Sequence, residues 1–375
     1  MAIDTFIEEW MHMNQKRCTK KWTAAKRRRQ SMTVSESRYR ADKTERPGGI
    51  RRKYFVIASA QDGMPLEGMM VIPSRPRAVL QIAHGMCEHK ERYLPFMRYM
   101  AERGYLCVIH DHRGHGASRR EAVSADADKV LGKKQDIPAG LGYFGKDGGR
   151  FLVRDLHQIT RIIKKQYPGL PYFMMGHSMG SYMLRKYLCI HPEGVAGAVI
   201  MGTGAMPDST MKFGLFLCRT IALFRGWHYR SRLMQSLSYS KPYKRYDLYG
   251  KDYANSWLSK NVENVKAYYA DPRCTFLFTV NGYKGLMEAV LFDNQMENIK
   301  KVPKNLPLFF VSGADDPVGD LGEGVKKVYG MYKDAGVSDI TYRLYEDDRH
   351  EILNETDRDQ VMADIAAWLN VHVEL

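Results

Sequence analysis

The pentapeptide Gly-His-Ser-Met-Gly at residues 176–180 places a serine between two glycines, a pattern suited to nucleophilic chemistry. It follows an apolar run at 170–175 and precedes a helical pattern at 181–190, so Ser178 is expected where a strand turns sharply into a helix. Such a turn exposes the serine hydroxyl in a strained conformation, and the flanking glycines remove Cβ atoms that would clash there. Ser178 is therefore predicted to be a nucleophile.

A serine nucleophile requires a histidine to take its proton and a carboxylate to orient that histidine. Two later apolar runs, at 306–311 and 340–345, are each followed by a polar loop, and these loops contain Asp316 and His350. The predicted catalytic order is therefore Ser178, Asp316, His350. The oxyanion of the tetrahedral intermediate also needs two backbone N–H donors, one of them from the residue after the nucleophile.

That residue is Met179, and the second donor is assigned to Met86, in the loop that follows the apolar run at 78–83. Glu88 and His89 end this loop. Either they contact a polar substrate head group, or they fix the loop by hydrogen bonds.

Neighbouring residues compete for two of the catalytic roles. Asp315 adjoins Asp316, while Asp347 and Asp348 come shortly before His350 and are expected to be solvated or turn residues. After Asp316 the chain has one histidine besides His350; this is His372, which follows the last predicted helix.

Four separated motifs carry a resemblance to a known family. They are His-Gly-Met-Cys-Glu-His at 84–89, Asp-His-Arg-Gly-His-Gly-Ala-Ser at 111–118, the Ser178 pentapeptide, and the Asp316 and His350 loops. The chain resembles α/β-hydrolases of the monoacylglycerol lipase and bacterial lysophospholipase group, also called serine aminopeptidase-like. This resemblance implies a mostly parallel eight-stranded sheet with helices on both faces and an inserted cap. The family usually has a small residue where this chain has Met86 and Cys87, which narrows the pocket floor and affects acyl-group preference.

The apolar pattern independently predicts an α/β fold. A strand pair at 54–58 and 67–72 precedes strands that alternate with helical segments, which is typical of a parallel sheet covered on both faces. We expect a basic arm at 1–52, the first part of the core at 53–205, a cap at 206–304 and the second part of the core at 305–375.

The predicted cap has 16 Lys and Arg against 8 Asp and Glu, and nine tyrosines lie between positions 229 and 283. Its apolar residues between 213 and 227 have the spacing of one or two amphipathic helices. Phe216 and Trp227 belong to this set and are predicted to contact the substrate along an acyl-chain tunnel. The alternative is that the apolar face only packs the cap onto the core.

The charge of +15 is concentrated at the N-terminus, where residues 1–53 have 15 basic and 6 acidic residues. The basic run 26–29 could contact an anionic membrane surface or nucleic acid, and nucleic acid is the less favoured of these two partners. The alternative is that the arm is solvated and binds neither. No signal-peptide pattern or membrane-length apolar segment is found, so we expect a cytoplasmic protein that is either free or peripheral at the membrane. The six cysteines show no paired spacing and are expected to be free thiols.

His110, His112 and His115 have part of the spacing of a metallo-hydrolase motif. Gly114 occupies the position where that motif has an aspartate, so we expect no metal here, and His112 and His115 are expected to be hydrogen-bonded loop residues. No cofactor is expected.

The predicted function is a serine hydrolase that cleaves carboxylic esters, of the lysophospholipase or monoacylglycerol lipase type that the resemblance implies. The alternatives are a serine aminopeptidase and, from another class, a non-catalytic ligand or membrane binder on a hydrolase fold. The oligomeric state is not predicted.

Overall fold

Apolar runs of five to eight residues form the central sheet of the computed structural model, which describes residues 40–41, 49–119, 140–239 and 241–373. These residues belong to one unit, Tyr39–Leu375. Most of the predicted arm, including the basic run 26–29, lies outside the described residues. The free, buried cysteines among the described residues are Cys87, Cys107, Cys189, Cys218 and Cys274.

The sheet has nine strands within the described residues, in the order β1-β2-β3-β5-β4-β6-β7-β8-β9. Strands β1, β2, β3 and β5 pair antiparallel, and all pairs from β5 to β9 are parallel. The predicted fold class is confirmed. The one strand beyond the expected eight is β1, a two-residue edge strand. The strands are β1 (Arg40–Ala41), β2 (Arg51–Ala58), β3 (Pro65–Ile72), β4 (Ala78–Ala83), β5 (Tyr105–His110), β6 (Tyr172–His177), β7 (Gly197–Met201), β8 (Leu308–Gly313) and β9 (Ile340–Tyr345).

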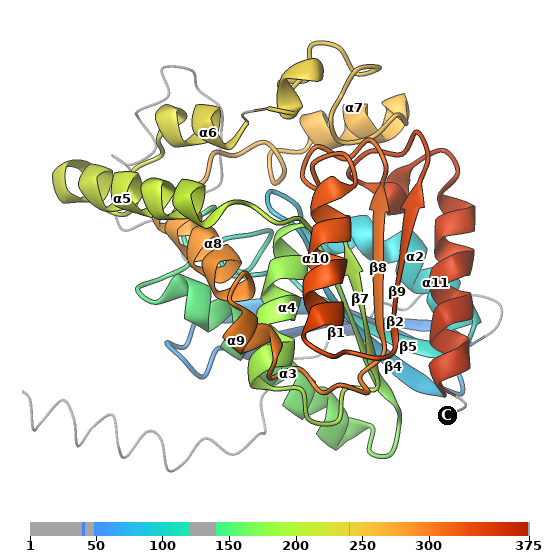
Figure 1. Cartoon of the computed structure of the whole chain (residues 1–375). Helices are drawn as coiled ribbons and strands as arrows, with labels where there is room; N and C mark the ends of the chain where they lie inside the picture. Colours follow the sequence, from blue (N-terminus) through green and yellow to red (C-terminus); the bar gives the residue numbers. More distant parts are fainter. Residues whose placement is uncertain (1–39, 42–48, 120–139, 240, 374–375) are drawn as a thin grey trace, which may run out of the picture. The chain divides into compact units, whose positions relative to one another are not determined.

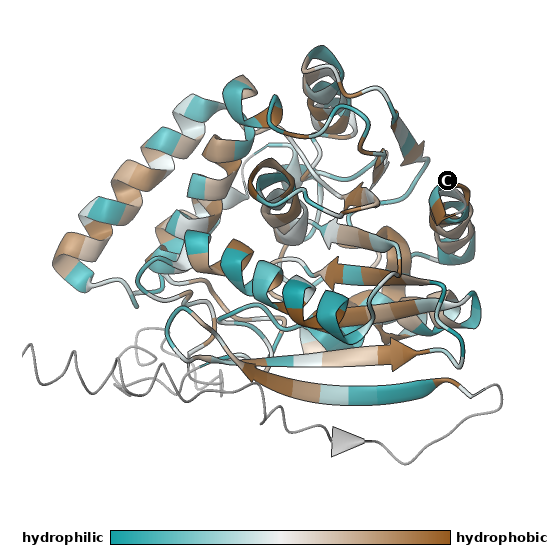
Figure 2. Cartoon of the chain, turned by 90° about the horizontal axis from the view of Figure 1, so that it is seen from below, coloured by the Kyte–Doolittle hydropathy of each residue, from teal (hydrophilic) through white to brown (hydrophobic). Residues whose placement is uncertain are grey.

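Helices cover both faces of this sheet, which explains why its central strands are continuously apolar and largely brown in Figure 2. Alternate residues of β4 enter different cores: Val79 packs with the helices of one face, and Leu80 with those of the other. Helices α3 (Gly148–Gln166), α4 (Met179–Ile190) and α10 (Glu323–Asp334) cover the first face, and α2 (Leu94–Glu102) and α11 (Arg358–Val373) cover the second.

The segment between β7 and β8 interrupts this alternation. It contains the helices α5 (Asp208–Arg225), α6 (Arg232–Ser238), α7 (Val262–Ala270), α8 (Val280–Asp293) and α9 (Met296–Ile299). Helix α8 packs on α3, α4 and α5, while α7 lies over the carboxyl ends of β8 and β9 and α6 lies beside α5 (Figure 1). Of the helices that the structure describes, none is long and apolar enough to cross a bilayer.

Candidate functional site

Ser178 lies at the end of β6 and is the N-cap residue of α4, with φ 53° and ψ −120°. This left-handed conformation is unusual for a residue with a side chain, and the two flanking glycines permit it. A Cβ atom on Gly180 would lie 2.6 Å from the carbonyl oxygen of His84 and closer still to that of Ala83. The close approach of these backbones holds the serine at the carboxyl end of β6.

Asp316 and His350 lie in the loops after β8 and β9, and their side chains meet. The His350 Nδ1 and Asp316 Oδ2 atoms are 2.9 Å apart, and both side chains are almost fully buried. The Asp316 carboxylate also accepts hydrogen bonds from the Val318 amide, at 2.8 Å, and the Ser312 hydroxyl, at 3.2 Å. The imidazole is thus oriented by a fixed carboxylate, which leaves Nε2 for proton transfer.

The other aspartates and the other histidine near the C-terminus lie outside the pair of Asp316 and His350. Asp348 forms a 2.7 Å ion pair with Lys260, and Asp347 is exposed with φ 60°. His372 contacts Asp339, which immediately precedes β9. It therefore lies at the amino end of that strand, away from the carboxyl ends where ligands of parallel sheets bind.

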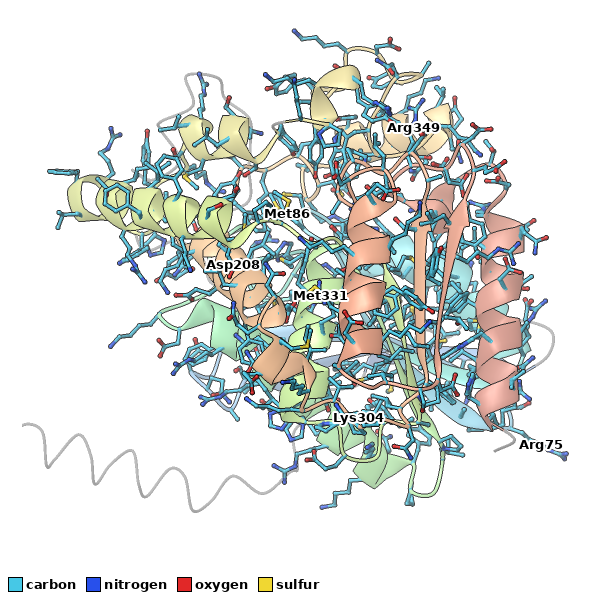
Figure 3. The ribbon with its side chains drawn as sticks, in the orientation of Figure 1. Arg75, Met86, Asp208, Lys304, Met331 and Arg349 are labelled. Atoms are coloured by element: carbon cyan, nitrogen blue, oxygen red, sulfur yellow. The ribbon has the colours of Figure 1, made fainter. Side chains whose placement is uncertain are left out.

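The loop after β4 lies against Ser178, because a Cβ atom on Gly85 would be 3.0 Å from the serine Cβ. Met86 follows directly and lies beneath the cap loops in Figure 3, while Met179 begins α4. Both backbone amides thus belong to segments beside the serine. Cys87 has φ 54°, and its thiol donates to the Phe276 carbonyl oxygen at 3.2 Å.

The Glu88 carboxylate turns inward and fixes this loop. Its Oε1 atom accepts hydrogen bonds from the Gly85 amide and, at 2.9 Å, from the Tyr93 hydroxyl, and it lies 3.1 Å from His177 Nδ1. Burial would raise the pKa of Glu88, but the hydrogen bond and charge of His177 outweigh it, and the pKa falls to about 2. His177 Nε2 in turn lies 3.1 Å from the His350 carbonyl oxygen.

His89 is also buried, between Glu91 at 2.7 Å and Asp271 of the cap at 3.0 Å. The contacts of Glu88 and His89 favour the interpretation that these residues fix the loop. Within the described residues, a group of three potential metal ligands consists of His89, Asp271 and Cys274. Arg273 pairs with Asp271 at 2.7 Å, and burial raises the pKa of the Cys274 thiol, so this group is a hydrogen-bonded contact between loop and cap.

Phe216 and Trp227 are on the outer surface of the cap, with 62% and 37% of their surface exposed. Leu215 of the same apolar set is buried, and Leu217 and Ile221 pack against the core. The predicted amphipathic helix is therefore present as α5, with one face packed and another exposed.

One aromatic residue of the cap, Trp257, lies next to His350, and two tyrosines contact it; none of the three was identified from the sequence. The Trp257 ring stacks on the His350 imidazole, with centroids 5.3 Å apart, and Tyr239 and Tyr243 contact Trp257. The high tyrosine content of this segment was the available signal. It could not indicate which rings reach the site, because Trp257 and His350 are far apart in the sequence.

Known proteins are similar to this chain in sequence and in fold. A sequence model of the family described as "Serine aminopeptidase, S33" matches residues 74–357. A monoglyceride lipase homolog of monkeypox virus is 25% identical over 297 residues, which cover 78% of this chain and 90% of that protein. Human monoglyceride lipase is 25% identical over 300 residues, which cover 79% of this chain and 83% of the human protein.

A solved structure is similar as well. A thermostable carboxyl esterase from Bacillus coagulans, crystallised with glycerol, is 27% identical with a TM-score of 0.74, and the alignment covers 86% of this chain and 99% of the esterase. The family match extends from before β4 to the start of α11 and includes Ser178, Asp316 and His350. The chain therefore belongs to the serine aminopeptidase S33 family of α/β-hydrolases.

Proposed function

We propose that the protein hydrolyses carboxylic esters of lipids, with Ser178, Asp316 and His350 as a catalytic triad. The buried 2.9 Å contact between His350 and Asp316, in a site whose serine has a left-handed backbone, is the observation that carries this proposal. His350 takes the proton of Ser178 as the hydroxyl attacks the acyl carbonyl carbon, and the Met86 and Met179 amides hold the oxyanion. His350 then protonates the leaving alcohol, and water releases the acid in a second cycle.

The substrate class is supported by the relatives, two of which are named as a monoglyceride lipase and a homolog of one. The family description names an aminopeptidase, but an aminopeptidase needs acidic groups to hold the substrate ammonium. Residues 206–304 instead have 16 basic and 8 acidic residues. This balance favours an ester whose head group is neutral or negative, either a monoacylglycerol or a lysophospholipid.

A fluorescent fluorophosphonate probe tests the nucleophile. Wild type is expected to be labelled and Ser178→Ala to be unlabelled. Ser338→Ala is a matched control, because Ser338 is exposed and its hydroxyl donates to the Lys304 carbonyl oxygen. Hydrolysis of monoacylglycerols, lysophospholipids and aminoacyl naphthylamides should then rank the substrates. Labelling that persists in Ser178→Ala, or cleavage of the naphthylamides alone, would overturn the proposal.

We further propose that the cap docks on an anionic lipid surface. The α5 and α6 segment exposes large apolar side chains, and α5 has three basic residues against one acidic residue. Such a combination inserts apolar groups among lipids while cations attract anionic head groups. The exposed side chains are Phe213, Phe216, Leu223, Phe224, Trp227, Leu233 and Leu237.

Sedimentation with anionic and zwitterionic vesicles tests this surface. The double substitution Leu223→Ser, Phe224→Ser should reduce binding to anionic vesicles and raise KM for a vesicle-borne ester, without changing kcat for a soluble ester. Val371→Ser is the control, because Val371 is 60% exposed on α11, outside the cap. Equal vesicle binding by the double variant and the control would contradict the docking surface.

A further inference from the structure

The Trp257 indole of the cap stacks on the imidazole of His350. Its ring is inclined by 29° to the His350 imidazole, with centroids 5.3 Å apart, so the two rings are stacked face to face. His350 has a second ring neighbour, His177, at 4.7 Å. The titratable groups that the structure places against His350 are therefore His177 and, through the Nδ1 contact, Asp316.

The cap segment that carries Trp257 is fastened to the loop that carries His350. The Leu258 carbonyl oxygen accepts a 2.8 Å hydrogen bond from the Glu351 amide. The Arg349 guanidinium donates to the carbonyl oxygens of Ala254, at 3.0 Å, and Ser256. These bonds lie on both sides of Trp257 and directly beside His350. The indole is thus held in register with the imidazole and is not on a freely moving lid.

We propose that Trp257 is a positioning residue for His350, which fixes the plane of the imidazole and stabilises its cationic form during acyl transfer. This inference rests on the proposed triad. When the Ser178 oxygen bonds to the acyl carbon, its proton moves to His350 Nε2 and the ring becomes a cation. The proton then passes to the leaving oxygen as the carbon–oxygen bond breaks. The face of an indole attracts a cation at this distance.

The other ring neighbour of His350 differs from Trp257 in polarity. His177 is buried, which alone would lower its pKa, but its hydrogen bond to Glu88 and the Glu88 charge raise the pKa. Its ring lies 4.7 Å from the His350 ring and is an imidazole that can itself carry a positive charge, so it does not offer the neutral aromatic face that Trp257 offers. Of these two ring neighbours, Trp257 comes from the cap.

Kinetics of Trp257→Leu and Trp257→Phe on a soluble short-chain ester test the inference. We expect Trp257→Leu to lower kcat roughly tenfold with little change in KM, and to move the acidic limb of the kcat/KM profile to lower pH, because the cation loses its aromatic neighbour. Trp257→Phe keeps an aromatic face, so its kcat and its pH profile should be close to those of wild type. Trp368→Leu is the matched control, since Trp368 stacks on Phe309 and lies 4.4 Å from His372. An unchanged kcat and pH profile in Trp257→Leu would overturn the inference.

A second readout does not depend on turnover. Protonated imidazole quenches a stacked indole, so the fluorescence difference between wild type and Trp257→Phe should titrate with pH. This titration should disappear when both proteins also contain His350→Gln. A titration without hydrolysis of any ester would leave the stacking role intact and refute the proposed function. Ester hydrolysis with no such titration would refute the role of Trp257 alone.

Discussion

Two adjacent aspartates differ in what their side chains contact. The Asp316 carboxylate is fully buried and orients His350. Asp315 is half-buried, and its backbone carbonyl oxygen accepts a hydrogen bond from the Tyr246 hydroxyl. Asp316→Asn should therefore lower kcat by about four orders of magnitude, because an amide favours the wrong tautomer of the histidine. Asp315→Asn is the matched control and should retain kcat within a few-fold. Steady-state kinetics on a soluble ester measure kcat for both variants. An equal loss of kcat in the two would show that Asp316 is not the acid that orients His350.

Two helical glycines have opposite surroundings. A Cβ atom on Gly180 would meet the backbone of residues 83 and 84, and that backbone leads into the oxyanion loop, whereas one on Gly330 of α10 would meet nothing within 4 Å. Gly180→Ala should displace the loop and abolish fluorophosphonate labelling. Gly330→Ala should raise the free energy of unfolding by about 0.5–1 kcal/mol through helix propensity. Normal labelling of Gly180→Ala would show that the backbones can separate without cost.

At the scale of residues, the sequence predicted where Ser178, Asp316 and His350 lie better than it predicted which side chains surround them. Ser178, Asp316 and His350 each follow an apolar run, and parallel strands bring their carboxyl ends to one edge, so their placement could be inferred from order alone. Trp257 lies in a segment with no clear periodicity. Its position depends on hydrogen bonds to residues about 90 positions away, and no local pattern encodes such bonds.

At the scale of elements, the cap segment at 254–261 and the histidine loop at 348–355 are joined through one buried carboxylate. Glu355 accepts hydrogen bonds from the Ser259 hydroxyl at 2.6 Å, the Lys260 amide at 2.9 Å and the Arg349 amide at 2.9 Å. Glu355→Ala would leave these buried donors without a partner. We expect it to lower the free energy of unfolding by about 3 kcal/mol and to reduce kcat, because the loop carries His350.

Urea denaturation monitored by circular dichroism measures this loss. Glu323→Ala is the control, because the Glu323 side chain is 69% exposed and pairs with Lys326 in the next turn. Its effect should stay within about 0.5 kcal/mol. Equal stability of the two variants would show that the cap is not fastened through Glu355. The sheet strands were predictable from apolar runs, but this junction was not, because its partners are polar loop residues.

At the scale of the whole molecule, four histidines are packed together in the interior: His84 in the loop after β4, His110 at the end of β5, and His112 and His115 in the loop after β5. The His84 and His112 rings are 4.4 Å apart, and the His110 and His112 rings 5.0 Å apart. Burial lowers the pKa of all four, to about 3 for His110 and about 4 for His115. The sequence predicted hydrogen-bonded loop histidines at 112 and 115. His115 Nδ1 lies 3.3 Å from the Arg113 carbonyl oxygen, but neither ring nitrogen of His112 has a hydrogen-bond partner within the described residues, so the prediction is wrong for the His112 side chain. The sheet explains the burial, since the parallel strands β4 and β5 end side by side.

This cluster should make the fold sensitive to acid. The unfolded chain binds protons at these histidines below about pH 6.5, and the folded chain binds them only at lower pH, so stability falls as the pH falls below about 6.5. Two buried aspartates act in the opposite direction. Burial raises the pKa of Asp293 to about 8 and that of Asp348 to about 7, so the folded protein binds these protons first. Among these six groups the four histidines outnumber the two aspartates, so together they favour a loss of stability between about pH 6.5 and 5.

His110→Phe isolates one of these contributions, because phenylalanine keeps an aromatic ring but cannot titrate. In the part of the chain that the structure describes, neither His110 ring nitrogen has a hydrogen-bond partner, so the substitution leaves no donor unpaired. The drop in unfolding free energy from pH 7 to pH 5 should be smaller by about 2 kcal/mol than in wild type, since 1.5 pH units are worth about 1.36 kcal/mol each. The neighbouring Ile109→Val removes a methylene and should cost about 1 kcal/mol equally at both pH values. If His110→Phe loses as much stability as wild type between these pH values, His110 must be protonated inside the folded protein, and the acid sensitivity must come from other groups.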